Sequence, residues 1–346
     1  MRKLNVLTAC SGIGAPEHAW RDLPFNFIGC SEIEPFPSAV LQHHYPTVKN
    51  YGDMNNYKDW KFNGATPDIL FSGTPCQSFS ISGLRAGLDS PNGNLALVFV
   101  AMVERFNPRW VVWENVVGTL SSNRGNDLFA ICHALAKCGY WWAYRVLDSS
   151  GWGIPQRRRR IYLIASNRSQ FHPAAVLFEQ ESLFRDSTKG QGTRQNITAP
   201  IENSSGATVY ENHATDSRIK VVDACPTITA RWGTGGNNTP IVMAVHQNQR
   251  QEVRLSNTAF TFSSSSTAKP GQGRNAVILE NQTVRRLMPS EAEQLMGFEK
   301  GYSAIDFKGK PASDANRYKA LGNSMAVPVV KWIGERIQMV EAVSDE

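Results

Sequence analysis

The sequence has few cysteines and no long apolar run. Its 346 residues include six cysteines without regular spacing, which excludes a scaffold dense in disulfides. No CxxC pair or cluster of Cys and His is present, so we predict no metal site. No run approaches the roughly 18 apolar residues that a membrane-spanning helix needs. We therefore expect a reduced, soluble, cytoplasmic protein with no membrane association.

A strong excess of charge of one sign is also missing. Lys and Arg together number 36 and Asp and Glu 30, giving a net charge of +6. This mild excess permits a polyanionic partner without demanding one. The apolar fraction of 41% is enough for a full core, and the length permits two domains or one domain with a large insertion. Within residues 1–20 a short apolar stretch leads directly into a glycine-containing turn, so we interpret that stretch as a first strand and not a signal peptide.

The first half of the chain alternates between strand-like and helix-like segments. The expected strands are residues 4–9, 27–31, 68–72, 110–113 and 160–165, and the expected helices are a stretch ending at Trp20 and residues 34–44, 95–106 and 127–138. This alternation predicts an α/β fold with a mostly parallel sheet that is covered by helices on both faces.

The composition changes after about Asn167. Polar, glycine-containing stretches follow, interrupted by short strand-like pieces at residues 220–222, 240–245 and 276–279. We expect a loop-rich, β-dominated second domain there. Helical patterning returns at Ser290, and residues 323–337 predict a closing helix. Its expected buried face consists of Met325, Val329, Trp332, Ile333 and Ile337. We expect residues 1–166 and 323–346 to form one domain, and residues 167–322 the second domain with a return segment.

Several residues in the first half suit a nucleotide-type cofactor. Residues 11–14 (SGIG) form a glycine turn after the first strand, where backbone and helix N-terminus can approach a ligand closely. An ordinary strand–helix turn explains this motif equally well. Glu32 follows the second strand, about 20 residues later, where a carboxylate suits ribose hydroxyls. Asp53 could accept a hydrogen bond from an exocyclic amine. Either acid could instead be an ordinary surface residue.

Three features near the strand ends could carry chemistry. Residues 73–80 directly follow the strand at 68–72, so Cys76 lies on a loop at the edge where such sheets bind ligands, and a thiolate there could be a nucleophile. Glu114 ends the strand at 110–113, and a half-buried carboxyl group at the same edge could be a general acid. The run at 157–160 is four arginines, of which Arg158 and Arg160 should face one way. They could hold phosphate or a base edge and lower a thiol pKa.

Simpler explanations exist for each of these features. Most cysteines are bystanders, and we assign that status to the other five. An arginine run is commonly a solvated or nucleic-acid-binding stripe.

Taken together and in order, these motifs resemble the DNA (cytosine-5) methyltransferase family of bacterial or phage type. The shared elements are the glycine turn, Pro75-Cys76-Gln77, Glu114-Asn115-Val116, residues 156–160 (QRRRR), residues 285–291 (RRLMPSE) and Gly322-Asn323-Ser324. Chance assembly of all six in sequence would be rare. The resemblance implies an S-adenosylmethionine-dependent, Rossmann-like catalytic domain plus a smaller β-rich target-recognition domain within residues 167–322.

The resemblance also implies a reaction. Cys76 would attack C6 of a cytosine flipped out of the duplex, and C5 would then take a methyl group from S-adenosyl-L-methionine. Glu114 would hydrogen-bond N3 and the N4 amine. Arg160, together with Arg158, would hold O2 and help to orient the Cys76 loop.

The implied cofactor and DNA contacts follow from the same matches. The cofactor-binding residues would be Cys10, Ser11, Gly12, Ile13, Gly14, Glu32, Ile33, Asp53, Met54, Gly73, Pro75, Leu95, Asn323 and Ser324. The DNA-binding residues would be Gln77, Ser80, Ser82, Asn115, Gln156, Thr227, Arg231 and Trp232. Asn115 would also steady the Cys76 loop. Arg231 could read guanine or meet only phosphate.

The first glycine turn departs from the family pattern. Thr8, Ala9 and Cys10 stand where the family usually has aspartate, leucine and phenylalanine, and Ala15 replaces the third glycine. Cys10 cannot supply an aromatic contact, so we expect cofactor binding that is weaker or differently packed.

Three other functions would each require a different set of residues from a DNA methyltransferase. A tRNA cytosine methyltransferase would share the framework, but that branch usually has a small recognition domain and a Cys-Phe-Thr element that this chain lacks. A catalytically silent DNA-binding protein would not need Cys76, Glu114, Arg158 and Arg160 intact. A nicotinamide-dependent dehydrogenase would leave the Pro75-Cys76-Gln77 loop unexplained. We expect a monomer that acts on double-stranded DNA, and the sequence specifies neither the target nor a companion restriction endonuclease.

Overall fold

The computed structural model describes most of the chain outside the loop after β3 and the polar connections of the second half. The described residues are 3–75, 95–169, 172–178, 207–212, 219–222, 241–244, 277–279 and 282–344. The predicted site residues Cys76, Gln77, Ser80, Ser82, Thr227, Arg231 and Trp232 lie outside the described residues.

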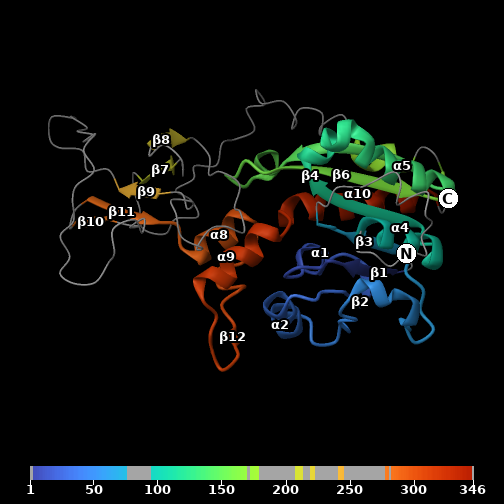
Figure 1. The fold of residues 1–346 in the computed structure, drawn as a ribbon, viewed down its shortest axis with the longest axis horizontal. Coiled ribbons are helices and arrows are strands. Elements are labelled where there is room, and N and C mark those ends of the chain that lie inside the picture. The colour runs from blue at the N-terminus through green and yellow to red at the C-terminus, as the bar shows by residue number, and fades with distance from the viewer. Residues whose placement is uncertain are drawn as a thin grey trace.

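A six-stranded mixed sheet forms the centre of the fold (Figure 1). Its strands are β1 (Leu4–Ala9), β2 (Phe25–Gly29), β3 (Ile69–Ser72), β4 (Trp110–Val116), β5 (Trp141–Asp148) and β6 (Arg159–Ser166), in the order β2-β1-β3-β4-β6-β5. The pairs among β1 to β4 are parallel, whereas β6 runs antiparallel to both β4 and β5. The predicted α/β class is confirmed, but the sheet is less parallel than expected, because β6 follows β5 through a short connection without a crossover helix.

Helices cover both faces of this sheet. The described helices are α1 (Ala15–Ala19), α2 (Pro35–His44), α4 (Leu95–Phe106), α5 (Asn126–Lys137), α6 (His172–Leu177), α8 (Pro289–Leu295), α9 (Asp314–Asn323) and α10 (Val327–Ser344), with short 3-10 turns at η1 (Met54–Asp59), η2 (Val117–Leu120), η3 (Ser122–Gly125) and η4 (Ser149–Trp152). Successive strand residues point to opposite faces. Thus Val6 and Phe71 pack with α1 and α10, whereas Leu7 and Leu70 pack with α4 and α5.

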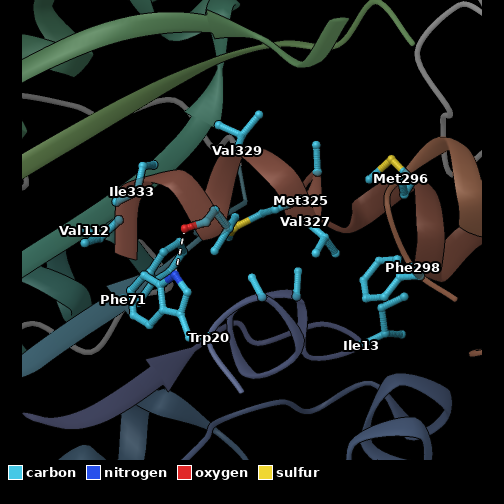
Figure 2. Close-up of a cluster of buried hydrophobic side chains, with 14 of the residues drawn as sticks. Ile13, Trp20, Phe71, Val112, Met296, Phe298, Met325, Val327, Val329 and Ile333 are labelled. Atoms are coloured by element: carbon cyan, nitrogen blue, oxygen red, sulfur yellow. Dashed lines mark hydrogen bonds between the residues drawn. The ribbon is translucent and has the colours of Figure 1, made fainter. Parts of the chain in front are cut away.

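One large side chain, Trp20, packs between the central sheet and α10. Trp20 is fully buried and its indole Nε1 donates a hydrogen bond to the carbonyl of Val330 at 2.7 Å (Figure 2). A Cβ at Gly334 would lie 2.3 Å from that Nε1. The absence of a side chain at residue 334 therefore leaves room for the Trp20 indole. The hydrogen bond joins residues that are 310 positions apart in the sequence.

The expected closing helix begins later than predicted. Residues 314–323 form α9, which we did not predict, and Asn323 is its last residue. Ser324 is extended, and α10 starts at Val327 with Pro328 in its first turn. A proline is tolerated there but cannot continue a preceding helix, so it separates α9 from α10. The predicted apolar face is confirmed, because Met325, Val329, Trp332, Ile333 and Ile337 are all buried.

A second sheet occurs in the variable half of the chain. It contains β7 (Ala207–Asn212), β8 (Ile219–Val222), β9 (Ile241–Ala244), β10 (Val277–Leu279) and β11 (Gln282–Arg286), ordered β10-β11-β9-β7-β8 with antiparallel pairing throughout. Three of these strands match the predicted short pieces, and β7 and β11 were not predicted. A small hairpin of β12 (Asp306–Phe307) and β13 (Lys310–Pro311) precedes α9. Among the described helices, none combines the length and apolarity needed to cross a membrane.

Candidate active site

The turn after β1 leaves exposed backbone at the end of the sheet. Cys10, Gly12 and Gly14 all have positive φ angles, of 51°, 57° and 83°. A Cβ on Gly14 would approach the Leu41 side chain to 2.9 Å, whereas a Cβ on Gly12 would meet nothing within 4 Å. The tight turn needs glycine at residue 14 for space. At residue 12 it presents an open stretch of main chain that a ligand could approach closely.

Glu32 lies directly beside this turn. The Gly12 N–H donates to Glu32 Oε2 at 2.8 Å and the Glu34 N–H to Oε1 at 2.8 Å. Burial raises the pKa of Glu32, and these N–H donors oppose the rise. A carboxylate offers about four acceptor positions, so the two backbone bonds leave capacity for a diol. The next residue, Ile33, is 65% exposed, which gives a free apolar surface for a ring next to that carboxylate.

Asp53 and Met54 complete this side of the turn. Asp53 caps η1 by accepting from the Asn55 N–H at 2.9 Å, and Met54 is buried. The Cys10 Sγ lies 3.5 Å from the Met54 Sδ, so the two predicted cofactor residues touch. Sulfur therefore packs against sulfur where the family pattern has an aromatic ring. Burial raises the pKa of the Cys10 thiol to about 12, so this cysteine is a neutral packing group.

The remaining predicted cofactor residues gather from three elements. Gly73 and Pro75 follow β3, and Leu95 begins α4 and packs on the same apolar cluster as Cys10. Asn323 is exposed and lines a pocket together with Glu34, so the end of α9 reaches the segment after Glu32. A Cβ at Gly73 would lie 2.5 Å from the Met325 Cε. Parts of the chain at residues 10–14, 32–34, 53–54, 73–75 and 323–325 therefore meet at one edge of the sheet.

The segment that leads into Cys76 is anchored at Thr74. The Trp113 Nε1 donates to Thr74 Oγ1 at 2.8 Å, and the Asn115 amide donates to the Thr74 carbonyl at 3.0 Å. β3 and β4 are parallel with Ser72 opposite Trp113, so both strands deliver these residues to the same edge. Asn115 thus binds the main chain two residues before Cys76.

Glu114 is 8% exposed and lies between these elements. Its Oε1 is 3.3 Å from Arg160 Nε, across the β4–β6 pairing. Burial raises the pKa of Glu114, and the charges of Arg160 and Arg158 oppose this rise. The carboxyl group is therefore predisposed to hold a proton while guanidinium groups remain close enough to stabilise the ionised form.

The arginine run alternates as predicted. Arg158 is 3% exposed and Arg160 is half-buried, whereas Arg157 and Arg159 face solvent. The Arg158 Nη2 donates to the carbonyls of Gly322 and Ser324. Burial lowers the pKa of Arg158 to about 10, which still leaves it charged. Arg158 therefore fixes the Gly322–Ser324 turn to the start of β6, and the charges of both Arg158 and Arg160 act on Glu114.

Two predicted DNA contacts are buried in this conformation. Gln156 is fully buried, with neither its amide nitrogen nor its amide oxygen hydrogen-bonded, and Asn115 is 3% exposed with its amide engaged. Both side chains are thus enclosed in this conformation, and their role as DNA contacts stays a prediction.

The contacts of some residues that shape the site could not be predicted from the sequence. Trp113 and Thr74 lie inside a motif but were not singled out, and their hydrogen bond is visible only once β3 and β4 are paired. A buried polar chain lies behind the glycine turn: it runs from Glu17 through Thr8 and Ser11 to Ser31. Glu17 follows a proline in the first turn of a helix, where an acidic residue is ordinarily solvated.

Comparison with known proteins identifies the family. The model for the C-5 cytosine-specific DNA methylase family matches residues 4–339. The chain belongs to this family. The resemblance to this family that the motifs indicate is therefore confirmed.

Individual relatives cover the methylase to different extents. The DNA N-6-adenine-methyltransferase of Escherichia phage P1 is 29% identical over 97% of this chain, which spans 61% of that relative's length. The type II methyltransferase M2.BsuMI of Bacillus subtilis (strain 168) is 25% identical over 99% of this chain and 77% of its own. Among solved structures, the S. pombe Dnmt2 methyltransferase has a TM-score of 0.64 at 19% identity and covers 99% of both chains. An E. coli prophage-encoded putative DNA modification methyltransferase has a TM-score of 0.58 at 18% identity, covering 98% and 100%. These structures support the fold.

Proposed function

We propose that this protein is a sequence-specific DNA cytosine-5 methyltransferase that uses S-adenosyl-L-methionine. The observation that carries the proposal is Glu114, a buried carboxyl group 3.3 Å from Arg160 at the edge where Thr74 anchors the segment leading into Cys76. A general acid, a fixed cation and a thiol-bearing loop are the groups that a cytosine ring needs for attack at C6.

The residues at the glycine turn fit the cofactor. Gly12 offers open backbone, Glu32 has acceptor capacity for the ribose diol, and Ile33 offers an exposed apolar face for adenine. The other proposed binding residues are Cys10, Ser11, Ile13, Gly14, Asp53, Met54, Gly73, Pro75, Leu95, Asn323 and Ser324. When bound, S-adenosylmethionine supplies the methyl group that cytosine C5 receives.

The protein's own groups would act on the cytosine ring. The Cys76 thiolate adds to C6. The C5=C6 π electrons shift towards C4 and N3, and the resulting enamine is nucleophilic at C5. Protonated Glu114 hydrogen-bonds N3 and stabilises the negative charge that develops there. Arg160 holds O2 and keeps Glu114 in place. After C5 has been methylated, a base takes the C5 proton and the electron pair of that bond re-forms C5=C6, which expels the thiolate.

The substrate is proposed to be double-stranded DNA. The target base must leave the stack to reach Cys76, so the enzyme would flip the cytosine. Gln77, Ser80 and Ser82 are proposed to close over the flipped site, and Thr227, Arg231 and Trp232 to face the DNA from the target-recognition domain. We propose a catalytic domain of residues 1–166 and 323–346, with residues 167–322 forming the recognition domain and return segment, in a cytoplasmic monomer.

Methyl incorporation into nucleic acid tests the proposal. The purified protein is incubated with methyl-labelled S-adenosylmethionine and either duplex DNA of mixed sequence or bulk tRNA, and the products are digested to nucleosides for mass spectrometry. We expect 5-methylcytosine in DNA, none in tRNA, and no product with Cys76→Ala. Bisulfite sequencing of host DNA after expression then gives the target sequence.

Other outcomes separate the alternatives. N6-methyladenine as the product would favour the activity in the name of the phage P1 relative. Label in tRNA alone would favour an RNA substrate. DNA binding without any methyl incorporation would favour a silent binding protein, and full activity of Cys76→Ala would overturn the nucleophile.

A further inference from the structure

A buried acidic residue lies behind the glycine turn and has no role in the reaction described above. Glu17 is in the first turn of α1 and is 1% exposed. The Thr8 hydroxyl donates to Glu17 Oε1 at 2.6 Å, while Oε2 is buried and has no hydrogen-bond partner. A carboxyl group is retained in such a place only where its contact compensates for the loss of water.

Glu17 ends a chain of hydrogen bonds that crosses the turn. The Thr8 Oγ1 lies 2.8 Å from the Ser11 Oγ, and the Ser31 N–H donates to the Ser11 Oγ at 3.2 Å. With Ser11 donating to Thr8, every donor points the same way and Glu17 is the terminal acceptor. The Ser11 Oγ has a longer contact of 3.3 Å with the Ser31 carbonyl.

Away from Glu17, the chain reaches proposed cofactor-binding groups through Ser11 and Ser31. Ser11 is the first residue of the glycine turn, and the Ser11 N–H also bonds the Ser31 carbonyl at 3.1 Å. Ser31 directly precedes Glu32, whose carboxylate accepts from Gly12. The Ser31 hydroxyl donates to the Gly52 carbonyl at 2.6 Å, next to Asp53. The chain therefore fixes the spacing between the turn, Glu32 and Asp53.

We infer that Glu17 is a positioning residue for the cofactor site, acting through Thr8 and Ser11 on Glu32. It supplies a buried carboxylate from α1 where residue 8 has only a hydroxyl. The inference rests on the proposed use of S-adenosylmethionine. It also explains how the turn is held although Thr8 itself cannot provide an acceptor group as strong as a carboxylate.

Cofactor binding tests the inference independently of catalysis. The probe is S-adenosylhomocysteine, titrated into the full chain by calorimetry. We expect Glu17→Ala and Thr8→Val each to weaken binding about tenfold, as removal of one partner of a buried hydrogen bond does. Glu17→Gln and Thr8→Ser keep the acceptor and the hydroxyl, so we expect them to bind within about threefold of the wild type. The double variant should lose no more than either single variant, because both break one chain.

Controls separate positioning from general destabilisation. Tyr140→Phe removes another buried hydroxyl, which bonds the Pro108 carbonyl at 2.6 Å far from the glycine turn, and it should bind the probe normally. In methylation assays, Glu17→Ala should raise KM for S-adenosylmethionine and leave kcat and KM for DNA unchanged. Wild-type affinity in both Glu17→Ala and Thr8→Val would overturn the inference. If the wild type itself does not bind the probe, the proposed cofactor is wrong instead.

Discussion

At the scale of single residues, two buried carboxyl groups stand out because water cannot stabilise their ionised forms. Burial raises the pKa of both Glu114 and Glu17. Glu114 has guanidinium groups nearby, whereas the titratable neighbours of Glu17 include Cys30, Tyr45 and Tyr302, which are neutral near pH 7. The first arrangement suits proton exchange at a reacting ring, and the second suits a fixed acceptor.

The Glu114→Gln substitution should lower kcat by about 100-fold or more, because an amide cannot hold the transferable proton. In the wild type, kcat should fall on the alkaline side as Glu114 loses its proton, and because its pKa is raised, this fall occurs above the usual carboxyl range. The variant should lack that limb of the profile. Single-turnover rates from pH 6 to 9 measure both. Glu104→Gln, an exposed carboxyl on α4, serves as the control and should change neither.

Glu17 should give the folding free energy a pH dependence of definite sign. Burial raises its pKa to about 7 from 4.5, so the folded state binds the proton more tightly than the unfolded state. The resulting stabilisation is complete below pH 4.5 and is lost as pH rises through 7, a change of about 3 kcal/mol. Urea unfolding from pH 5 to 8.5 should therefore show wild type losing stability relative to Glu17→Gln. Parallel curves for the two proteins would contradict this.

At the scale of elements, the contact between α1 and α10 depends on a missing side chain. Because a Cβ at Gly334 would sit 2.3 Å from the Trp20 indole, Gly334→Ala must displace Trp20 and lengthen its bond to Val330. We expect a loss of about 1–3 kcal/mol in unfolding free energy. Gly118→Ala is the matched control, since its Cβ would meet only Val116 at 3.8 Å. Equal thermal stability of the two variants would refute the packing argument.

Elements whose apolar pattern is fully buried could be predicted from the sequence. The strand at 4–9 and the helix at 95–106 were predicted to the residue, because apolar side chains fill them. β5 was missed although it contains three aromatic residues: it is an edge strand, and Trp141 and Trp142 are exposed. α9 was missed because its sequence is mostly polar and only one side of it is buried.

The same distinction applies to the site. The placement of Glu114 near the end of β4 and of Glu32 after β2 could be predicted, because strand ends converge on one edge of a sheet. The contact of Arg158 with Gly322 and Ser324 could not, since it joins residues 164 and 166 positions apart. The Glu17 chain was equally hidden, because it depends on how α1 packs beneath β1.

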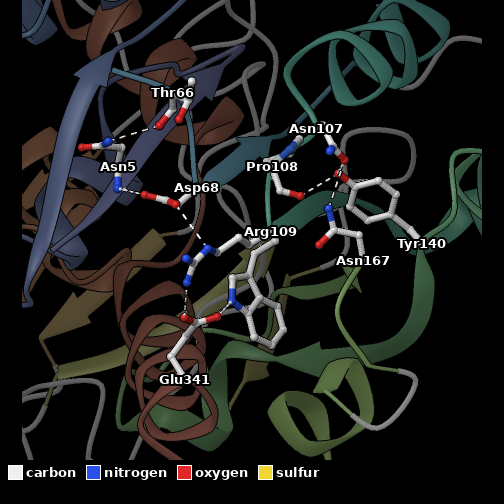
Figure 3. A network of polar contacts seen from close by, with 10 residues as sticks. Asn5, Thr66, Asp68, Asn107, Pro108, Arg109, Tyr140, Asn167 and Glu341 are labelled. Atoms are coloured by element: carbon white, nitrogen blue, oxygen red, sulfur yellow. Dashed lines mark hydrogen bonds and ion pairs between the residues drawn. The ribbon is translucent and has the colours of Figure 1, made fainter. Parts of the chain in front are cut away.

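At the scale of the whole molecule, the last helix is tied to the opposite edge of the sheet from the candidate active site. Glu341 accepts from the Trp110 Nε1 at 2.6 Å and from Arg109 Nη1 at 3.1 Å, and Arg109 Nε lies 3.4 Å from Asp68 (Figure 3). Asp68 in turn accepts from the Asn5 N–H at 2.9 Å. The network joins α10 to the starts of β1, β3 and β4.

Removing Glu341 should therefore destabilise the whole molecule. Glu341→Ala leaves the Trp110 N–H buried without its acceptor and Arg109 without one of its two carboxylates, and we expect a loss of about 3 kcal/mol. Urea denaturation measures it. Glu335→Ala is the control on the same helix, because its 3.9 Å pair with Lys331 is exposed and should contribute almost nothing. Comparable midpoints for the two variants would contradict the prediction.

The position of α10 also has a consequence for synthesis of the chain. The six strands of the central sheet are complete once residue 166 has been made, yet the apolar face that packs against Trp20 is covered by residues from 287 onward. During translation that face stays uncovered until the final helices leave the ribosome, after the entire variable region has emerged. The nascent chain thus carries an open hydrophobic sheet for more than a third of its elongation, which is a condition that favours chaperone binding.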